Sequence, residues 1–204
     1  MVDTRVSLPP LPELERICRG LATLDAILMP EWQDRYYSFN AAWAPSQRMA
    51  SMRNGEGDDW FIVFTPAGVF LKSFWHEYRP PLTPAAIYDG IPAGFEAQRV
   101  EPAFSMACVT YGGWCDDRGW TLRGLLAPMK HEIEMLAGAP ETYQAYAADY
   151  FEVDVPLDAV AHVLDGRPLD DVLLARLRPE CTLAELADDL TEIGYRAPLR
   201  PRDA

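Results

Sequence analysis

The sequence predicts an α+β protein: an N-terminal helix, an antiparallel meander sheet of about five or six strands, and a C-terminal group of about four helices. Two observations predict this class. Apolar residues are spaced as in helices near the N-terminus and again after residue 140, whereas residues 36–75 hold short aromatic and β-branched runs separated by turn residues. We expect a single domain over residues 1–204, with the first helix and the sheet in residues 1–140 and the helical part in residues 141–204.

The first helix is expected from Leu11 to Met29. Pro12 suits the first turn of a helix and Pro30 ends it. The apolar positions fall at three- and four-residue intervals, which predicts one face packed on a core: Leu14, Ile17, Leu21, Leu24 and Leu28.

The sheet is expected to begin with four short strands, at residues 36–40, 48–53, 60–64 and 69–75. A further hairpin is expected from residues 105–111 and 120–122 around the turn at residues 116–119. The proline- and glycine-rich stretch 78–101 is expected to be an ordered loop with a short helical turn.

The turn chemistry predicts a register for the central hairpin. If residues 66–68 form a three-residue loop with Gly68 in the left-handed conformation, Phe64 pairs with Phe70. By the same register Trp60 pairs with Phe74, and Asp58 lies opposite His76. Residues 54–57 form a connection short enough to turn the chain back after the preceding strand, at residues 48–53.

Four helices are expected in the C-terminal part, at residues 141–151, 156–164, 168–177 and 183–193. Proline near their starts, and glycine or proline after their ends, supports the boundaries. The last helix has a capping box formed by Thr182 and Glu185 and a glycine stop at Gly194.

The composition excludes several classes of function. With 31 acidic and 18 basic residues the formal net charge is −13, and residues 131–204 alone hold 16 acidic and 6 basic residues. Such a charge disfavours nucleic-acid binding, and no run of about 18 apolar residues predicts a membrane span. The four cysteines lack zinc spacing, so we expect idle thiols in a cytoplasmic protein.

One polar constellation stands out, at one end of the meander: Arg53, Asp58, Asp59, His76 and Glu77. Asp58 facing His76 could orient an imidazole for general-base catalysis, or the two could hold a metal ion with Glu77. Strand alternation places Asp59 and Glu77 on the other face, which weakens both ideas. A structural salt bridge and turn cap with Arg53 is the competing interpretation.

Two tryptophans are further candidates for binding, Trp43 before Pro45 and Trp114 beside two glycines, because we expect their rings to be exposed. Trp60 and Trp75 are assigned to the core. No glycine loop of the phosphate-binding type, EF-hand or nucleophile motif is present, so no catalytic residue, cofactor or metal is assigned.

The segment from Tyr36 to Glu77 resembles a family of uncharacterised bacterial proteins. The resemblance rests on the strings YYSFN at residues 36–40 and MASMRNGEGD at residues 49–58, followed by an aromatic strand, Gly68 and the His76-Glu77 pair. It implies a common fold and no established reaction.

A looser likeness, in class and charge, is to the immunity proteins of bacterial toxin systems. It implies a non-enzymatic acidic protein that masks a basic protein partner. The alternative is a small hydrolase or metal-dependent enzyme centred on Asp58 and His76.

Overall fold

The computed structural model describes residues 8–79, 81–124 and 130–196. Its α+β class is the one predicted, with an N-terminal helix, a six-stranded antiparallel sheet and a set of C-terminal helices. The chain divides into two compact units, which we describe separately: unit 1 comprises residues 1–38 and 132–204, and unit 2 comprises residues 39–131. The prediction of a single domain over residues 1–204 stays a prediction.

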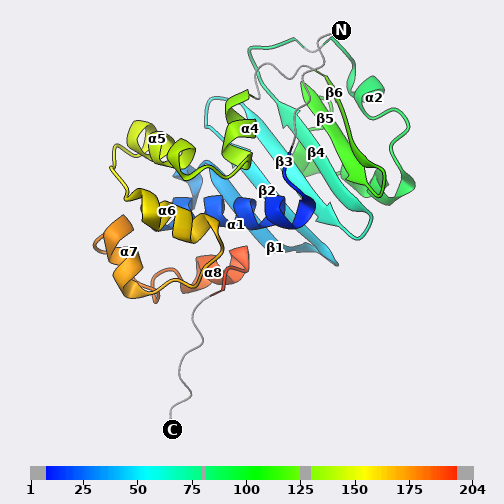
Figure 1. Cartoon of the computed structure of the whole chain (residues 1–204). Coiled ribbons are helices and arrows are strands. Elements are labelled where there is room, and N and C mark those ends of the chain that lie inside the picture. The colour runs from blue at the N-terminus through cyan, green and yellow to red at the C-terminus, as the bar shows by residue number, and fades with distance from the viewer. Residues whose placement is uncertain (1–7, 80, 125–129, 197–204) are drawn as a thin grey trace. The chain divides into compact units, whose positions relative to one another are not determined.

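Unit 1 is helical and combines the N-terminal and C-terminal segments of the chain (Figure 1). Helix α1 (Leu11–Leu28) packs against α6 (Leu157–Leu164), α7 (Asp171–Leu177) and α8 (Ala187–Ile193), and α5 (Pro140–Tyr150) packs against α6. The apolar face predicted for the first helix is confirmed, since Leu14, Ile17, Leu21 and Leu24 are buried. The unit also contains η1 (Trp32–Asp34) and α4 (Lys130–Leu136) from Glu132 onward.

The C-terminal helices follow the predicted order. Thr182 and Glu185 make the reciprocal hydrogen bonds of a capping box, in which the Glu185 carboxylate accepts the Thr182 N–H and the Thr182 hydroxyl accepts the Glu185 N–H. The box bounds a turn at residues 183–186 and not the helix, because α8 begins after it, at Ala187, without a side-chain cap. Gly194 is left-handed (φ 66°) at the end of α8, as its position predicts. Helix α4 was not predicted, and α7 and α8 begin three and four residues later than expected.

The six strands pair in chain order (Figure 1): β1 (Tyr37–Ala44), β2 (Gln47–Arg53), β3 (Asp59–Thr65), β4 (Gly68–Phe74), β5 (Tyr111–Asp116) and β6 (Gly119–Gly124). The meander prediction is therefore confirmed. The prediction of a strand at residues 105–111 was wrong, because the chain reaches the sheet only at Tyr111. Before it come four short helical turns: α2 (Pro84–Ile87), η2 (Ala93–Phe95), α3 (Glu96–Arg99) and η3 (Pro102–Phe104).

The predicted register of the central hairpin was wrong by one residue. Phe64 pairs with Val69 and not with Phe70, because the loop has two residues, 66 and 67, between Thr65 and Gly68. The Thr65 hydroxyl accepts the Ala67 N–H and donates to the Gly68 carbonyl, which closes the turn. Gly68 belongs to the strand, where a Cβ would lie 2.0 Å from a main-chain oxygen of β5.

The corrected register fixes which side chains share a face. Met49, Val63, Phe70 and Trp114 form one row across four neighbouring strands. Within unit 2 this face packs against buried side chains of the helical segment before β5, which are Ile87, Tyr88, Ile91, Phe95, Phe104 and Val109. The sheet therefore has an extensive apolar core on this side, with Phe61 in it as well.

Candidate functional site

Asp58 and His76 meet, although the register that predicted their contact was wrong. One carboxylate oxygen of Asp58, Oδ1, lies 2.8 Å from both the main-chain nitrogen and the ring Nδ1 of His76. The other oxygen accepts the side-chain amide of Asn54 at 2.9 Å. The hydrogen bond to Asp58 raises the pKa of the exposed His76 ring. Asp58 precedes β3 and His76 follows β4, and the Asp59–Phe74 pair at the end of this ladder brings the two residues together in the observed register.

The remaining members of the predicted constellation do not join this pair. Asp59 points to Lys72, as the alternation predicted, and Glu77 is exposed. Arg53 lies opposite Asp59, with its guanidinium 5.4 Å from the ring centre of Phe61. The expected turn cap exists, but Asn54 supplies it in place of Arg53, since its side-chain oxygen accepts the main-chain N–H groups of residues 56 and 58.

Lys72 lies in a buried, partly aromatic environment that was not predicted from the sequence. Its side chain is fully buried, 5.5 Å from the ring centres of both Phe61 and Phe74, and its ammonium donates to Asp59. Burial lowers the pKa of Lys72 and raises the pKa of Asp59, while their contact opposes both shifts. A lysine within an apolar strand was the available signal. Because the amine is inaccessible, the pair is a structural ion pair.

The tryptophans differ from expectation. Trp114 was predicted to be exposed, but it is only 5% exposed, because its position on β5 faces the apolar core. Trp43 lies in β1 and not in a loop, and its partly buried ring stacks on Phe104 at 6.2 Å. The tryptophan with a large exposed surface is Trp32, at 54%.

A buried carboxyl group organises unit 1. Asp25 in α1 is fully buried and accepts four hydrogen bonds: the main-chain N–H groups of Tyr36 and Tyr37 at 2.9 and 2.8 Å, and the hydroxyls of Tyr143 and Tyr146 at 2.8 and 3.3 Å. Burial raises the pKa of Asp25 from 3.8 to about 7, against the lowering effect of the four donors. The sequence signal for this buried group was an aspartate four residues after Leu21, beside the predicted apolar face of the helix.

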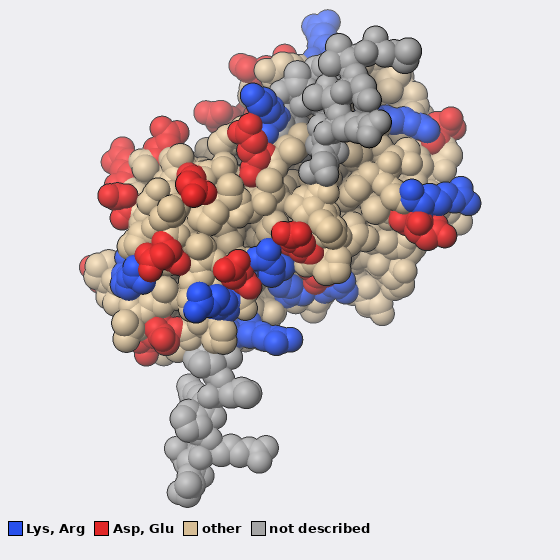
Figure 2. Space-filling view, in the orientation of Figure 1, with Lys and Arg blue, Asp and Glu red and all other residues tan. Residues whose placement is uncertain are grey.

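The negative charge belongs to unit 1. Its residues include 22 acidic and 10 basic side chains, whereas unit 2 has 9 and 8. Residues 132–166 hold eight carboxylates and no lysine or arginine. Figure 2 shows acidic groups alone on the part of the visible surface where α5 lies in Figure 1.

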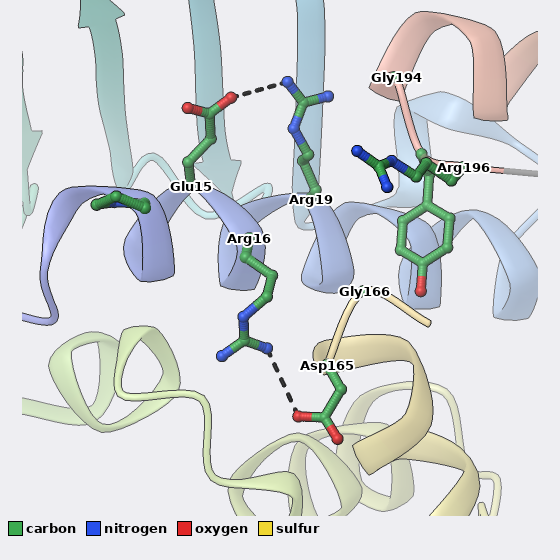
Figure 3. Close-up of a pocket in the computed structure, with 9 residues that line it drawn as sticks. Glu15, Arg16, Arg19, Asp165, Gly166, Gly194 and Arg196 are labelled. Atoms are coloured by element: carbon green, nitrogen blue, oxygen red, sulfur yellow. Dashed lines mark hydrogen bonds and ion pairs between the residues drawn. The ribbon is translucent and has the colours of Figure 1, made fainter. Parts of the chain in front are cut away.

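A pocket of about 480 Å³ lies within unit 1 (Figure 3). From α1, Arg16 donates to the carbonyl of Leu164 and Arg19 donates to that of Ile193, the last residues of α6 and α8. Cations at helix C-termini stabilise them, so both arginines tie α1 to its neighbours. The pocket is lined by Pro12, Glu15, Arg16, Arg19, Asp165, Gly166, Gly194, Tyr195 and Arg196.

Carboxylates balance much of this positive charge. Arg19 pairs with Glu15 at 2.8 Å, and Arg16 lies 3.7 Å from Asp165. The carbonyl ends of two helices add partial negative charge beside them. The pocket is therefore a contact between helices and not a built anion site.

The described residues hold neither a metal cluster nor a membrane-spanning helix. In ranges 8–79, 81–124 and 130–196, no group of three or more histidine, cysteine or acidic side chains lies close enough together to hold a metal ion. No helix in those ranges combines the length and apolar character needed to cross a bilayer. The four cysteines are free, and only Cys108 is exposed.

Comparison of the chain with protein-family models, with curated proteins and with solved structures found no match. The resemblance to uncharacterised bacterial proteins and the looser likeness to immunity proteins therefore stay predictions.

Proposed function

We propose that this chain is a non-enzymatic, cytoplasmic binding protein that masks a basic protein partner, in the manner of an immunity protein. The observation that carries the proposal is the charge of unit 1, and within it the eight carboxylates between residues 132 and 166 with no lysine or arginine among them. Unit 2, which is close to neutral, supplies no comparable field.

Several of these carboxylates are available to a partner. Glu141, Asp149, Glu152 and Asp154 are exposed and lie on α5 or directly after it. A concentrated field of one sign speeds the encounter with a partner of the opposite sign and repels partners of the same sign. It also makes binding sensitive to salt. These properties suit a protein whose task is to capture and cover a basic surface.

The test is affinity capture with the tagged full chain from lysate of its native host, at about 50 mM and about 300 mM salt. We expect a basic protein in stoichiometric amount at the lower salt concentration, and much less at the higher. The captured protein is then purified and titrated with the chain. Recovery of no stable partner at low salt, or of a partner with an acidic surface, would refute the proposal.

A second candidate function is a small hydrolase, favoured by the 2.8 Å contact between Asp58 and His76. Asp58 holds the Nδ1 side of the ring, which leaves Nε2 as the free base. The test is hydrolysis of ester and phosphoester model substrates by the wild type and by His76→Gln. Activity that survives this substitution unchanged excludes His76 as the base.

A further inference from the structure

Aromatic side chains are exposed where α5 ends, beside η1 in unit 1. Tyr150, the last residue of α5, is 38% exposed, and its hydroxyl donates to the Asp34 carbonyl at 2.9 Å. The ring of Tyr36 lies 4.1 Å from that of Tyr150. Trp32, the most exposed of these aromatics, belongs to the same 3-10 turn as Asp34. These contacts join η1 and the end of α5 into one surface, which we call the α5-end surface.

The carboxylates around these rings are placed where they do not stabilise the helix. Asp149 is in the last turn of α5, and Glu152 and Asp154 follow directly, whereas the last turn contains no basic residue. Acidic side chains at a helix C-terminus repel its partial negative charge. All three side chains are exposed, so their charges face solvent.

The backbone at this position is also unusual. Glu152 has φ 56°, a left-handed conformation that glycine normally occupies after a helix. Elsewhere in the unit, Gly138, Gly166 and Gly194 take the left-handed positions, and the two that follow α6 and α8 end those helices. At the end of α5 a glutamate occupies this position, at a conformational cost.

An exposed tryptophan ring and exposed carboxylates on one surface match one kind of group, an organic cation. A guanidinium stacks on an aromatic ring while its N–H groups donate to neighbouring carboxylates, and it is less strongly hydrated than an ammonium. Arginine is also enriched at the energetically important positions of protein interfaces. Charge complementarity and the exposed rings together therefore favour an arginine-bearing protein segment over a neutral apolar one.

We propose that the α5-end surface, formed by Trp32, Tyr150, Asp149, Glu152 and Asp154, docks an arginine-bearing segment of a protein partner. A guanidinium group lies on the Trp32 ring, beside Tyr150, and the carboxylates accept hydrogen bonds from the segment's guanidinium groups. This inference rests on the proposed masking function, and it names the surface and the side chain that the partner presents.

The test uses the full chain and a labelled synthetic peptide of alternating arginine and serine, about 12 residues long, with fluorescence anisotropy at about 100 mM salt. The test variant D149N/E152Q/D154N removes three charges without changing side-chain size. The matched control E134Q/E180Q/D188N removes three exposed charges elsewhere. We expect about tenfold weaker binding for the test variant and less than about twofold for the control, since screening is about 10 Å. Trp32→Leu should weaken binding about threefold.

Three results would overturn the inference: no binding by the wild type, equal weakening by both triple variants, or unchanged binding by Trp32→Leu. A lysine–serine peptide that binds as tightly as the arginine peptide would overturn the assignment of guanidinium groups. A host partner that binds every variant equally leaves the masking function in place and overturns this surface. Peptide binding localised here, with no partner captured from the host, supports the surface and refutes the masking function.

Discussion

Replacing Asp25 with asparagine should change how the stability of the protein depends on pH. The carboxyl is fully buried in α1, with two main-chain N–H groups and two tyrosine hydroxyls as its partners. Burial raises its pKa to about 7, compared with an ordinary value of 3.8 that applies when the chain is unfolded. Asparagine has nearly the same shape and does not titrate in this range.

The sign of the effect follows from these two pKa values. Between them the native state holds the Asp25 proton and the unfolded state does not, so the stabilisation from this group is greatest below pH 4. It is lost as the pH rises towards about 7. One proton over one pH unit corresponds to about 1.4 kcal/mol, so wild type should lose about 2.5 kcal/mol relative to Asp25→Asn between pH 5 and pH 8.

The measurement is the free energy of unfolding in urea, determined for both proteins at pH 5, 6, 7 and 8 by circular dichroism. Groups common to both proteins that do not interact with Asp25 cancel in the difference. Asp188→Asn is the control, because it makes the same chemical change at an exposed position of the same unit. Its difference from wild type should be small at every pH.

A difference between wild type and Asp25→Asn that stays flat, or that grows in favour of wild type as the pH rises, would refute this reasoning. It would mean that the four hydrogen-bond donors stabilise the ionised carboxylate more than burial destabilises it.

Three further predictions concern unit 2. Lys72→Met should change the free energy of unfolding by less than about 1 kcal/mol, whereas Asp59→Ala should cost about 3 kcal/mol, because it leaves a buried ammonium without its partner. Gly113→Ala should cost at least about 2 kcal/mol, since the new Cβ would lie 1.9 Å from a main-chain oxygen of β6. Asp58→Asn should lower the pKa of the His76 ring, measured by its NMR titration, because the charged hydrogen-bond acceptor is removed.

Each of these predictions has a control or a contrary outcome. Gly90→Ala separates crowding from backbone strain: Gly90, unlike Gly113, has a positive φ of 74°, and its Cβ would meet nothing within 4 Å, so its loss of stability reports strain alone. A larger loss of unfolding free energy for Lys72→Met than for Asp59→Ala would contradict the first prediction. It would show that removing the partner of the Asp59 carboxylate destabilises the protein more than removing the partner of the Lys72 ammonium. An unchanged His76 titration in Asp58→Asn would mean that the pair is not coupled in solution.

The sequence was sufficient for the elements and their order but not for the hairpin register. Spacing of apolar residues located α1 and most strands, because burial of one face imposes that spacing on the chain. The register depended on whether Gly68 belongs to the turn or to the strand. Both roles suit glycine, and the close approach of β5 that decides between them involves residues more than 40 positions away.

In the candidate site, too, some features could be predicted from the sequence and others could not. Asp58 and His76 could be paired from the sequence because Asp58 directly precedes β3, His76 closely follows β4, and a short turn joins the two strands. The four-donor environment of Asp25 could not, because Tyr143 and Tyr146 come from a helix 118 and 121 residues later in the chain. The exposure of Trp32 and the burial of Trp114 likewise depend on what packs beside each ring, and local sequence carries little of that information.

Unit 1 combines residues 1–38 with residues 132–204, and this has a consequence for synthesis on the ribosome. The helices that pack against α1, and the tyrosines of α5 that donate to its Asp25, all follow the sheet in the chain, so these partners of α1 are absent while the sheet is being made. The meander can form as it emerges, because each of its strands pairs with the next along the chain. Helix α1 has all of these partners only after α8 has been made, and a chaperone that shields this helix would act before that point.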